Sequence, residues 1–294
     1  MIIGDLNTEV VAAQLNLLFD ITAIFKRRGR LVSGYADISQ LLFDPTPYDA
    51  FERYYPLFHS SAFRRVTSLV ANSQKAMDLE EILLKCPDLK AERIRETLDK
   101  AVSSALIHSE GSSYLPSNPV GFGPTFEWYV AAVCQQELAS IAYWGVKVEK
   151  LTGDYDVVLV RENQVGYVEC KSGKMSNITR KDIESFLERE RVLSPHFSIY
   201  LVDGVSRDSI NTLIDFALEQ KLKYEYEMIG VMNTSVSLEA EEYRNFVRLV
   251  PINAYFLSTT NSVITSIREV YEFLTLVCDR GLPTENIAAK AKFR

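Results

Sequence analysis

Two neighbouring stretches decide the fold of this chain: Gly153-Asp154-Tyr155-Asp156-Val157-Val158-Leu159-Val160 and Val165-Gly166-Tyr167-Val168-Glu169-Cys170-Lys171-Ser172-Gly173. Each is a short apolar run rich in β-branched and aromatic residues, and the segment 161–164 between them is polar, as in a turn. The pattern therefore predicts a β-hairpin, with strands over 156–160 and 165–171.

The second of these strands carries two charged side chains near its end. Because successive side chains of a strand point to opposite faces, Glu169 and Lys171 should share a face with Tyr167, and Cys170 should lie on the other. A buried ionisable group costs free energy unless it meets a partner or a cation. Asp156 opens the first strand, so pairing across the turn should bring it to the same end as Glu169 and Lys171.

This arrangement predicts a metal site that hydrolyses phosphodiester bonds. Carboxylate and carbonyl oxygens suit Mg²⁺ or Mn²⁺, so we expect Asp156, Glu169 and the backbone carbonyl of Cys170 as ligands. A divalent ion polarises a phosphate and lowers the pKa of a bound water. Lys171 can orient or deprotonate the attacking water, or stabilise the developing charge.

The order of these residues resembles that of a known family. An aspartate on one strand (Asp156) followed by Glu-x-Lys on the next (Glu169-Cys170-Lys171) is similar to the PD-(D/E)xK, or restriction-endonuclease-like, nuclease superfamily. The resemblance implies an α/β fold with a mixed sheet flanked by helices, and metal-dependent nuclease activity. It also implies an acidic residue in the helix before the hairpin, the place that Glu127 occupies here.

The chain departs from the family pattern in its first motif. No proline precedes the aspartate, and Asp154 is a competing carboxylate. We favour Asp156 because it directly abuts the apolar run 157–160. The resemblance covers roughly residues 121–280 and does not extend to residues 1–116.

The residues after 120 alternate between helical and extended patterns. The run Gly121-Phe122-Gly123-Pro124 is typical of a linker. In addition to the hairpin, we expect helices over 125–142, 179–193, 207–220 and 261–278. We expect further strands over 146–150, 197–202, 224–231 and 246–257. Thr179 is the expected N-cap of the second of these helices. This alternation predicts a sheet flanked by helices.

The N-terminal part has a different rhythm. Residues 8–75 have a helical pattern, and 77–116 follow the order helix, turn, helix and small hairpin, which is similar to a winged helix. We therefore expect a helical and winged-helix-like domain over 1–120 and a nuclease-like domain over 121–294. Such a unit ahead of a Glu-x-Lys core is also similar to ancillary nucleases of prokaryotic antiviral defence systems, including the CRISPR-associated type.

Composition excludes several other classes of protein. The chain is 47% hydrophobic and 24% charged, which is ordinary for a globular protein. The four cysteines lie far apart without a C-x-x-C pair, so a structural zinc site is not expected. No apolar run approaches the roughly 20 residues that span a bilayer, and the N-terminus lacks the order of a signal peptide. We expect a cytoplasmic protein with no membrane partner.

The net charge of −7 leaves alternatives to the nuclease open. Proteins that coat nucleic acid usually have a basic excess. One alternative is a catalytically silent nucleic-acid-binding or regulatory protein built on a nuclease-like core, and another is an assembly protein that binds no nucleic acid. For the nuclease we expect DNA rather than RNA as substrate, since winged helices most often bind duplex DNA, and a homodimer, since cutting two strands needs two sites.

Overall fold

The computed structural model describes residues 21–73, 75–150, 153–161, 164–173, 175–204, 211–218, 239–242, 246–250, 254–259 and 262–280. The beginning of the expected helical segment 8–75 and the expected strand 224–231 lie outside these residues.

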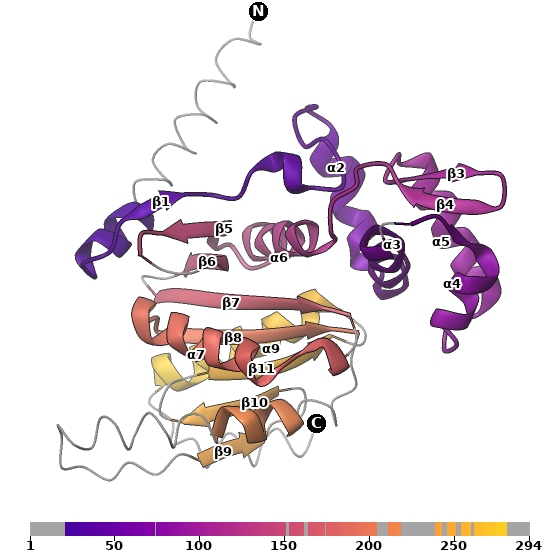
Figure 1. Ribbon diagram of the computed structural model, residues 1–294. Helices are drawn as coiled ribbons and strands as arrows, with labels where there is room; N and C mark the ends of the chain where they lie inside the picture. The colour runs from indigo at the N-terminus through magenta and orange to yellow at the C-terminus, as the bar shows by residue number, and fades with distance from the viewer. Residues whose placement is uncertain are drawn as a thin grey trace, which may run out of the picture.

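Within the described residues, eight strands form one mixed sheet (Figure 1). Their order across the sheet is β1 (Val32–Gly34), β5 (Ile141–Val148), β6 (Asp154–Arg161), β7 (Gln164–Ser172), β8 (Phe197–Asp203), β11 (Ala254–Thr259), β10 (Phe246–Val250) and β9 (Glu239–Glu242). β8 is parallel to both β7 and β11, and the other neighbouring pairs are antiparallel. The expected mixed sheet is confirmed.

The expected hairpin is formed by β6 and β7. Their register runs from Arg161 opposite Gln164 to Val157 opposite Val168. The backbone of β7 packs closely against a side chain of β8 at Gly166, where a Cβ atom would lie 2.3 Å from the Phe197 ring. A side chain at this position would push the two parallel strands apart.

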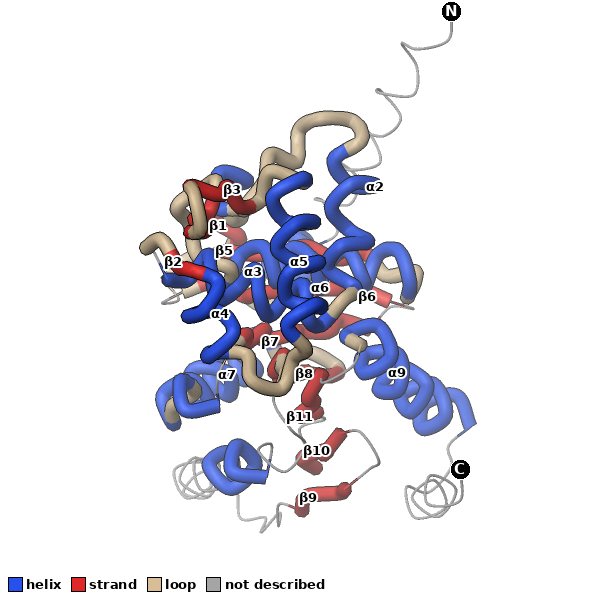
Figure 2. The backbone as a smooth tube through the Cα atoms, turned by 90° about the vertical axis from the view of Figure 1, so that its right-hand side faces the viewer, coloured by secondary structure: helices blue, strands red, loops and turns tan. Residues whose placement is uncertain are grey.

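Helices cover both faces of the sheet (Figure 2). α6 (Gly123–Glu137) and α9 (Val263–Arg280) pack on one face, and α7 (Arg180–Leu193) and a helix over 211–218 pack on the other. We call the two hydrophobic cores the α6-side core, which contains Val130, Val157, Val168 and Ile267, and the α7-side core, which contains Val158, Tyr167, Phe186 and Leu213. None of the helices in the described ranges is long and apolar enough to cross a membrane.

The remaining N-terminal elements form a smaller unit beside the sheet. They are two 3-10 helices, Ile38–Gln40 and Tyr55–His59, with α2 (Ala50–Tyr54), α3 (Ser61–Ser73), β2 (Met77–Asp78), α4 (Leu79–Lys85), α5 (Ala91–Ser103), β3 (Ile107–Glu110) and β4 (Ser113–Pro116). β2, β4 and β3 make a small antiparallel sheet in that order. The expected order of helix, turn, helix and hairpin is present over 79–116.

Several expected elements differ from what is observed. The helix expected over 125–142 ends at Glu137, and the strand expected over 146–150 is β5, which begins at Ile141 and ends at Val148. Part of the segment expected to be helical, β1, is instead an edge strand in which Val32 pairs with Val148 of β5. Ahead of it, Ile21 and Phe25 belong to the α7-side core. The strand expected over 246–257 is two antiparallel strands, β10 and β11. Local apolar pattern alone cannot reveal a chain reversal inside such a run.

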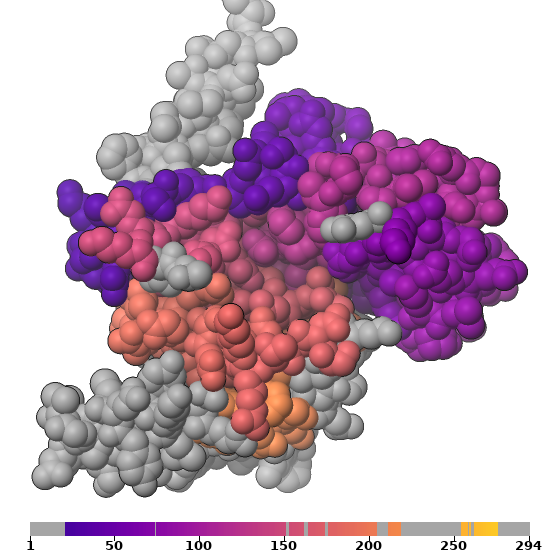
Figure 3. Space-filling view, in the orientation of Figure 1, coloured from indigo at the N-terminus to yellow at the C-terminus, as the bar shows by residue number. Residues whose placement is uncertain are grey.

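The predicted boundary near residue 120 does not separate two hydrophobic cores. Phe58 of the N-terminal unit lies 6.1 Å from Phe122, ring centre to ring centre, and both belong to the α6-side core with Phe126. Figure 3 shows the indigo-to-magenta N-terminal residues directly against the body of the protein. The two-domain division stays a prediction.

A buried ion pair fastens the N-terminal unit to the sheet. Arg64 of α3 donates from Nε and Nη2 to the two carboxylate oxygens of Asp203, both at 2.7 Å. Arg64 is fully buried and also donates to the carbonyl of Phe58 at 2.7 Å. Asp203 ends β8 and accepts a further hydrogen bond from the hydroxyl of Thr259 at the end of β11. The pair is therefore fully hydrogen-bonded, which a buried charge requires.

We expect Arg64→Ala to lower the free energy of unfolding by roughly 3–5 kcal/mol, because it leaves the Asp203 carboxylate buried without its partner. Urea denaturation at neutral pH measures the loss. The adjacent Arg65→Ala is a matched control, since its pair with Asp88 is partly exposed and should contribute less than about 1 kcal/mol. Equal losses in the two variants would contradict the anchoring role.

Candidate active site

The charged end of β7 lies on the α7 side of the sheet, as its alternation predicts. Tyr167 belongs to the α7-side core and Cys170 to the α6-side core. Glu169 is directed to the same side as Tyr167, whose hydroxyl donates a hydrogen bond to Glu169 Oε2. The expected division of side chains between the two faces is confirmed for this strand.

Glu169 is a buried carboxylate held by two cations. It is 1% exposed. Its Oε1 lies 2.8 Å from Lys171 Nζ, and its Oε2 accepts a hydrogen bond from Arg189 Nη1 at 2.8 Å. Arg189 comes from α7, so this ion pair also fixes the helix on the strand. Together with the Tyr167 hydroxyl, three donors satisfy a group whose burial would otherwise be costly.

Lys171 remains accessible while it contacts Glu169. Its side chain is 28% exposed, and Nζ also lies 3.7 Å from Asp182 Oδ1 at the start of α7. Burial alone would lower the pKa of Lys171, but the negative charges of Glu169 and Asp156 outweigh burial and raise the pKa. The side chain is therefore an ammonium group at neutral pH. Asp182 is itself fixed by a capping box with Thr179, which confirms Thr179 as the N-cap.

Asp156 lies where the alternation of side chains between the two faces of the sheet is interrupted in both β5 and β6. Trp144 packs against the α6-side core but Val146 belongs to the α7-side core, although residues two apart on a strand normally share a face. Between them stands Gly145, with a φ of +58°. Its neighbours Trp144 and Val146 pair with Val157 and Tyr155, the two residues that flank Asp156. A Cβ atom at Gly145 would lie 2.2 Å from the Cβ of Ala36. This kink requires glycine.

The kinked position turns the Asp156 carboxylate toward β7. Asp156 is 8% exposed, and its Oδ2 accepts a hydrogen bond from the backbone N–H of Cys170 at 2.7 Å. The N–H and C=O groups of one strand residue face the same neighbouring strand, so the Cys170 carbonyl is also directed toward β6. The structure thus brings together Asp156, Glu169, Lys171 and the Cys170 backbone. Asp154 makes no comparable contact with β7 among the described residues.

Glu127 approaches the site from α6. Burial, and next the charges of Asp154 and Glu169, raise the pKa of Glu127 to about 8. Within the part of the chain that the structure describes, its side chain has no hydrogen-bond or ion-pair partner. The pKa of Asp156 is also well above its usual range, because of burial and then repulsion by Glu169 and Glu127. These carboxyl groups therefore act on one another electrostatically.

The charge balance of the site fits a divalent cation. Asp156, Glu127 and Glu169 face two cations, Lys171 and Arg189, and both of these contact Glu169. Asp156 and Glu127 are left in a field that favours their neutral forms, and a bound cation would reverse that preference. No group of three His, Cys, Asp or Glu side chains in the described ranges is placed to hold a metal ion. The expected ligands, the carboxylates of Asp156 and Glu169 and the carbonyl of Cys170, suit an ion that keeps several waters, as Mg²⁺ does.

Three contacts at the site were missed by the sequence analysis. Arg189 lies in a charge-rich stretch of α7, a pattern typical of a solvated helix face, so nothing local marked it as a partner of Glu169. The Tyr167 hydroxyl could have been found from the two-residue period that places it beside Glu169. Asp182 could have been found from its position three residues after Thr179, where capping boxes have an acidic residue.

The pH dependence of stability should report on Glu127. In the unfolded chain its carboxyl group ionises near its ordinary pKa of 4.5, whereas in the folded protein it ionises near pH 8. Between these values the folded state binds the additional proton, so this group makes the protein less stable as pH rises. Glu127→Gln should match wild type at pH 4.5 and become more stable than wild type by pH 9, by at least about 1.4 kcal/mol.

Urea denaturation in EDTA at several pH values measures this difference. Glu80→Gln, in the exposed first turn of α4, controls for the general effect of removing one negative charge. A difference between Glu127→Gln and wild type that does not change with pH would contradict the assignment.

A double-mutant cycle should detect the Glu169–Arg189 pair. Arg189→Met should lower the free energy of unfolding by about 2–3 kcal/mol, because a buried charged hydrogen bond is lost. In a Glu169→Gln background the same change should cost less, with a coupling on the order of 1 kcal/mol or more. Arg191→Met, on the same helix, is the control, because its pair with Glu188 is exposed. Strict additivity at Glu169 and Arg189 would show that the pair contributes nothing.

Comparisons with known proteins find similarity in structure and none in sequence. No protein-family model matches the chain, and no curated protein matches it. The crystal structure of protein VC1899 from Vibrio cholerae is 14% identical with a TM-score of 0.43, over 67% of this chain and 55% of that one. A structure of Can2 from Sulfobacillus thermosulfidooxidans in complex with cyclic tetra-adenylate (cA4) is 13% identical with a TM-score of 0.42, over 73% and 61%. This chain thus spans less than two thirds of either protein.

Proposed function

We propose that this protein is a metal-dependent nuclease that hydrolyses phosphodiester bonds in nucleic acid. The observation that carries the proposal is the convergence of Asp156, Glu169 and Lys171 at the open end of the β6–β7 hairpin. Two buried carboxylates beside an accessible ammonium group are costly to maintain in a protein that does not use them. Their order along the chain is that of the PD-(D/E)xK nucleases.

The metal ligands in this proposal are Asp156, Glu169 and the Cys170 carbonyl, and the ion is Mg²⁺ or Mn²⁺. Such an ion, when bound, polarises the scissile phosphate and lowers the pKa of a coordinated water. Lys171, Arg189 and the Tyr167 hydroxyl hold the Glu169 side chain in place at the site. Asp156 is oriented by the Cys170 N–H.

Lys171 acts in this proposal as a charged group. Because its pKa is raised, it donates hydrogen bonds to the attacking water or to the phosphate oxygens and stabilises negative charge that develops there. Of the roles expected from the sequence, orientation and charge stabilisation are therefore favoured over deprotonation of the water. Glu127, with a pKa of about 8, is suited to exchange a proton near neutral pH.

Duplex DNA is the substrate that we favour. Arg64 and Asp203 fasten the winged-helix-like unit to the end of β8, and Asp203 is the register partner of Ser172, next to Lys171. A nucleic acid bound to that unit would therefore lie near the catalytic end of the sheet. Cleavage of both strands requires two sites, so we propose a homodimer that acts in the cytoplasm. A role in antiviral defence rests on the family resemblance alone.

A catalytically silent protein that binds nucleic acid is the second candidate. The engagement of Glu169 by two cations favours it, because a carboxylate already neutralised by Lys171 and Arg189 is stable without metal. This candidate predicts nucleic-acid binding that depends on salt and not on a divalent ion.

Cleavage assays separate the two candidates. Plasmid, linear and single-stranded DNA and RNA are incubated with the protein in Mn²⁺, Mg²⁺ or EDTA. We expect metal-dependent cleavage of DNA that falls at least about 100-fold in Glu169→Ala and Lys171→Ala. Glu188→Ala, a charge removal elsewhere on α7, should keep full activity.

Each variant is first checked for its fold by circular dichroism and thermal melting. Cleavage that persists in a folded Lys171→Ala variant would exclude the proposed site. Metal-independent binding without cleavage by folded wild-type protein would favour the silent candidate.

A further inference from the structure

A buried hydroxyl group without a partner lies beside the charged end of β7. Tyr200 of β8 is the register partner of Glu169, and its side chain is fully buried in the α7-side core. Its hydroxyl oxygen makes no hydrogen bond within the part of the chain that the structure describes. A buried polar group without a hydrogen bond costs free energy, and phenylalanine would fill the same space without that cost. The packing of the core therefore does not explain this hydroxyl.

Two aromatic neighbours hold the Tyr200 ring in place. The ring stacks on Phe256 of β11 with the ring centres 5.6 Å apart, and it meets Phe186 of α7 edge to face at 5.1 Å. Aromatic pairs at these distances are favourable. The position of the hydroxyl oxygen is thus fixed by packing, and only its hydrogen is free to turn.

The charged groups of the candidate active site act on this hydroxyl. Burial raises the pKa of Tyr200, and the negative charges of Glu169 and Asp182 raise it further. The phenol therefore keeps its proton, and carboxylates are the acceptors nearest in kind to receive it in a hydrogen bond. Among the residues that the structure describes, Glu169 combines this charge with the neighbouring strand position.

The two carboxylate oxygens of Glu169 are supported unequally. Oε2 accepts hydrogen bonds from the Tyr167 hydroxyl and from Arg189, whereas Oε1 lies 2.8 Å from Lys171 Nζ. The Lys171 side chain is 28% exposed, so it can turn toward solvent or toward a bound phosphate. Oε1 then loses its donor inside the core, which is costly unless another donor replaces it.

We propose that Tyr200 is a positioning residue whose hydroxyl donates a hydrogen bond to Glu169 when Lys171 turns away to contact a phosphate group. Neighbouring strands lie about 5 Å apart, so the released carboxylate has the Tyr200 hydroxyl beside it. Tyr200 then keeps Glu169 in place while Lys171 acts on the substrate. The turn of Lys171 toward phosphate rests on the proposed function, but the pairing of Tyr200 with a released Glu169 does not.

A double-mutant cycle on the metal-free protein tests this role. Lys171→Met removes the ammonium group and so imitates the state in which Lys171 has turned away. In wild type, Tyr200→Phe should leave the equilibrium constant of unfolding unchanged or lower it, because a hydroxyl without a partner is removed. In Lys171→Met the same change should raise that constant at least about tenfold, because a hydrogen bond to a charged group is lost. Urea denaturation in EDTA measures both effects.

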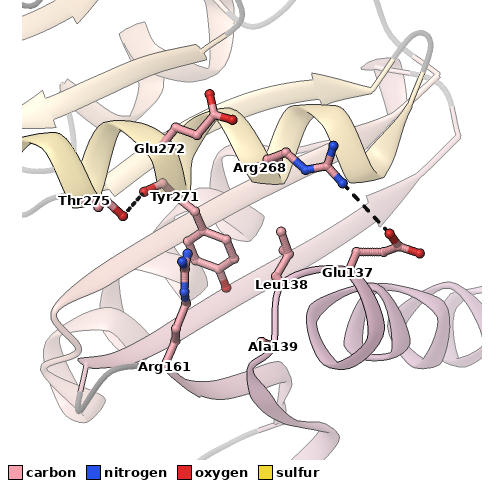
Figure 4. Close-up of a pocket in the computed structure, with 8 residues that line it drawn as sticks. All are labelled: Glu137, Leu138, Ala139, Arg161, Arg268, Tyr271, Glu272 and Thr275. Atoms are coloured by element: carbon pink, nitrogen blue, oxygen red, sulfur yellow. Dashed lines mark hydrogen bonds and ion pairs between the residues drawn. The ribbon is translucent and has the colours of Figure 1, made fainter.

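Two matched controls accompany the cycle. Tyr129→Phe removes another buried hydroxyl that has no partner among the described residues, and it should have the same effect in both backgrounds. Arg268→Met removes a positive charge on the α6 side of the sheet, where Arg268 lines a hollow and pairs with Glu137 at 3.9 Å (Figure 4). In that background Tyr200→Phe should act as it does in wild type. Lys171→Gln is a second background, and thermal melting checks the fold of each variant.

The proposal is overturned if Tyr200→Phe has the same effect in wild type as in the folded Lys171 variants, the result expected where a bound water already satisfies the hydroxyl. In the cleavage assay, Tyr200→Phe should lower kcat at least about fivefold and leave KM unchanged, because the hydrogen bond forms only after Lys171 has engaged the phosphate. Full kcat in this variant would also overturn it. Wild type that cleaves no nucleic acid contradicts the proposed function instead, and the cycle in EDTA still decides the role of Tyr200.

Discussion

The buried carboxylate of Glu169 is the group around which the central part of this protein is built. An isolated charge at 1% exposure would be too costly to keep. Its partners come from two elements: Lys171 and Tyr167 from its own strand, and Arg189 from α7. The ion pair therefore does two things at once. It fixes α7 on the sheet, and it concentrates the available positive charge on one of the three carboxyl groups at the site.

The geometry of the site depends on a second constraint, the kink at Gly145. Without it, the alternation of β6 would continue unbroken, and Asp156 would lie in the same row as Val158 on the α7 side. The left-handed conformation of Gly145 and the approach of Ala36 to it change the facing of both strands. Asp156 can then meet the Cys170 N–H. An edge segment far away in sequence thus helps to aim a carboxylate, at a position where only glycine fits.

The sequence allowed the hairpin, its facing and the group Asp156, Glu169 and Lys171 to be predicted, because strand alternation is a local property. The same local signals gave the Thr179 cap and most helices after residue 120. They could not give the Arg189 pair or the edge strand β1. Each depends on contacts between segments far apart in the chain. The sequence of a charged or short mixed stretch is the same whether that stretch is exposed to solvent or paired with another segment.

The Arg64–Asp203 pair joins a helix of the N-terminal unit to the end of a strand of the sheet. The parallel strands β7, β8 and β11 end side by side, and in such sheets the carboxyl ends are where ligands bind. Asp203 and Thr259 close two of these ends, and Arg64 covers them from α3. Among these three described strand ends, that of β7 keeps an accessible charged side chain, Lys171. The N-terminal unit thus holds the end of the neighbouring strand β8 through Arg64 and leaves the candidate site at the end of β7 accessible.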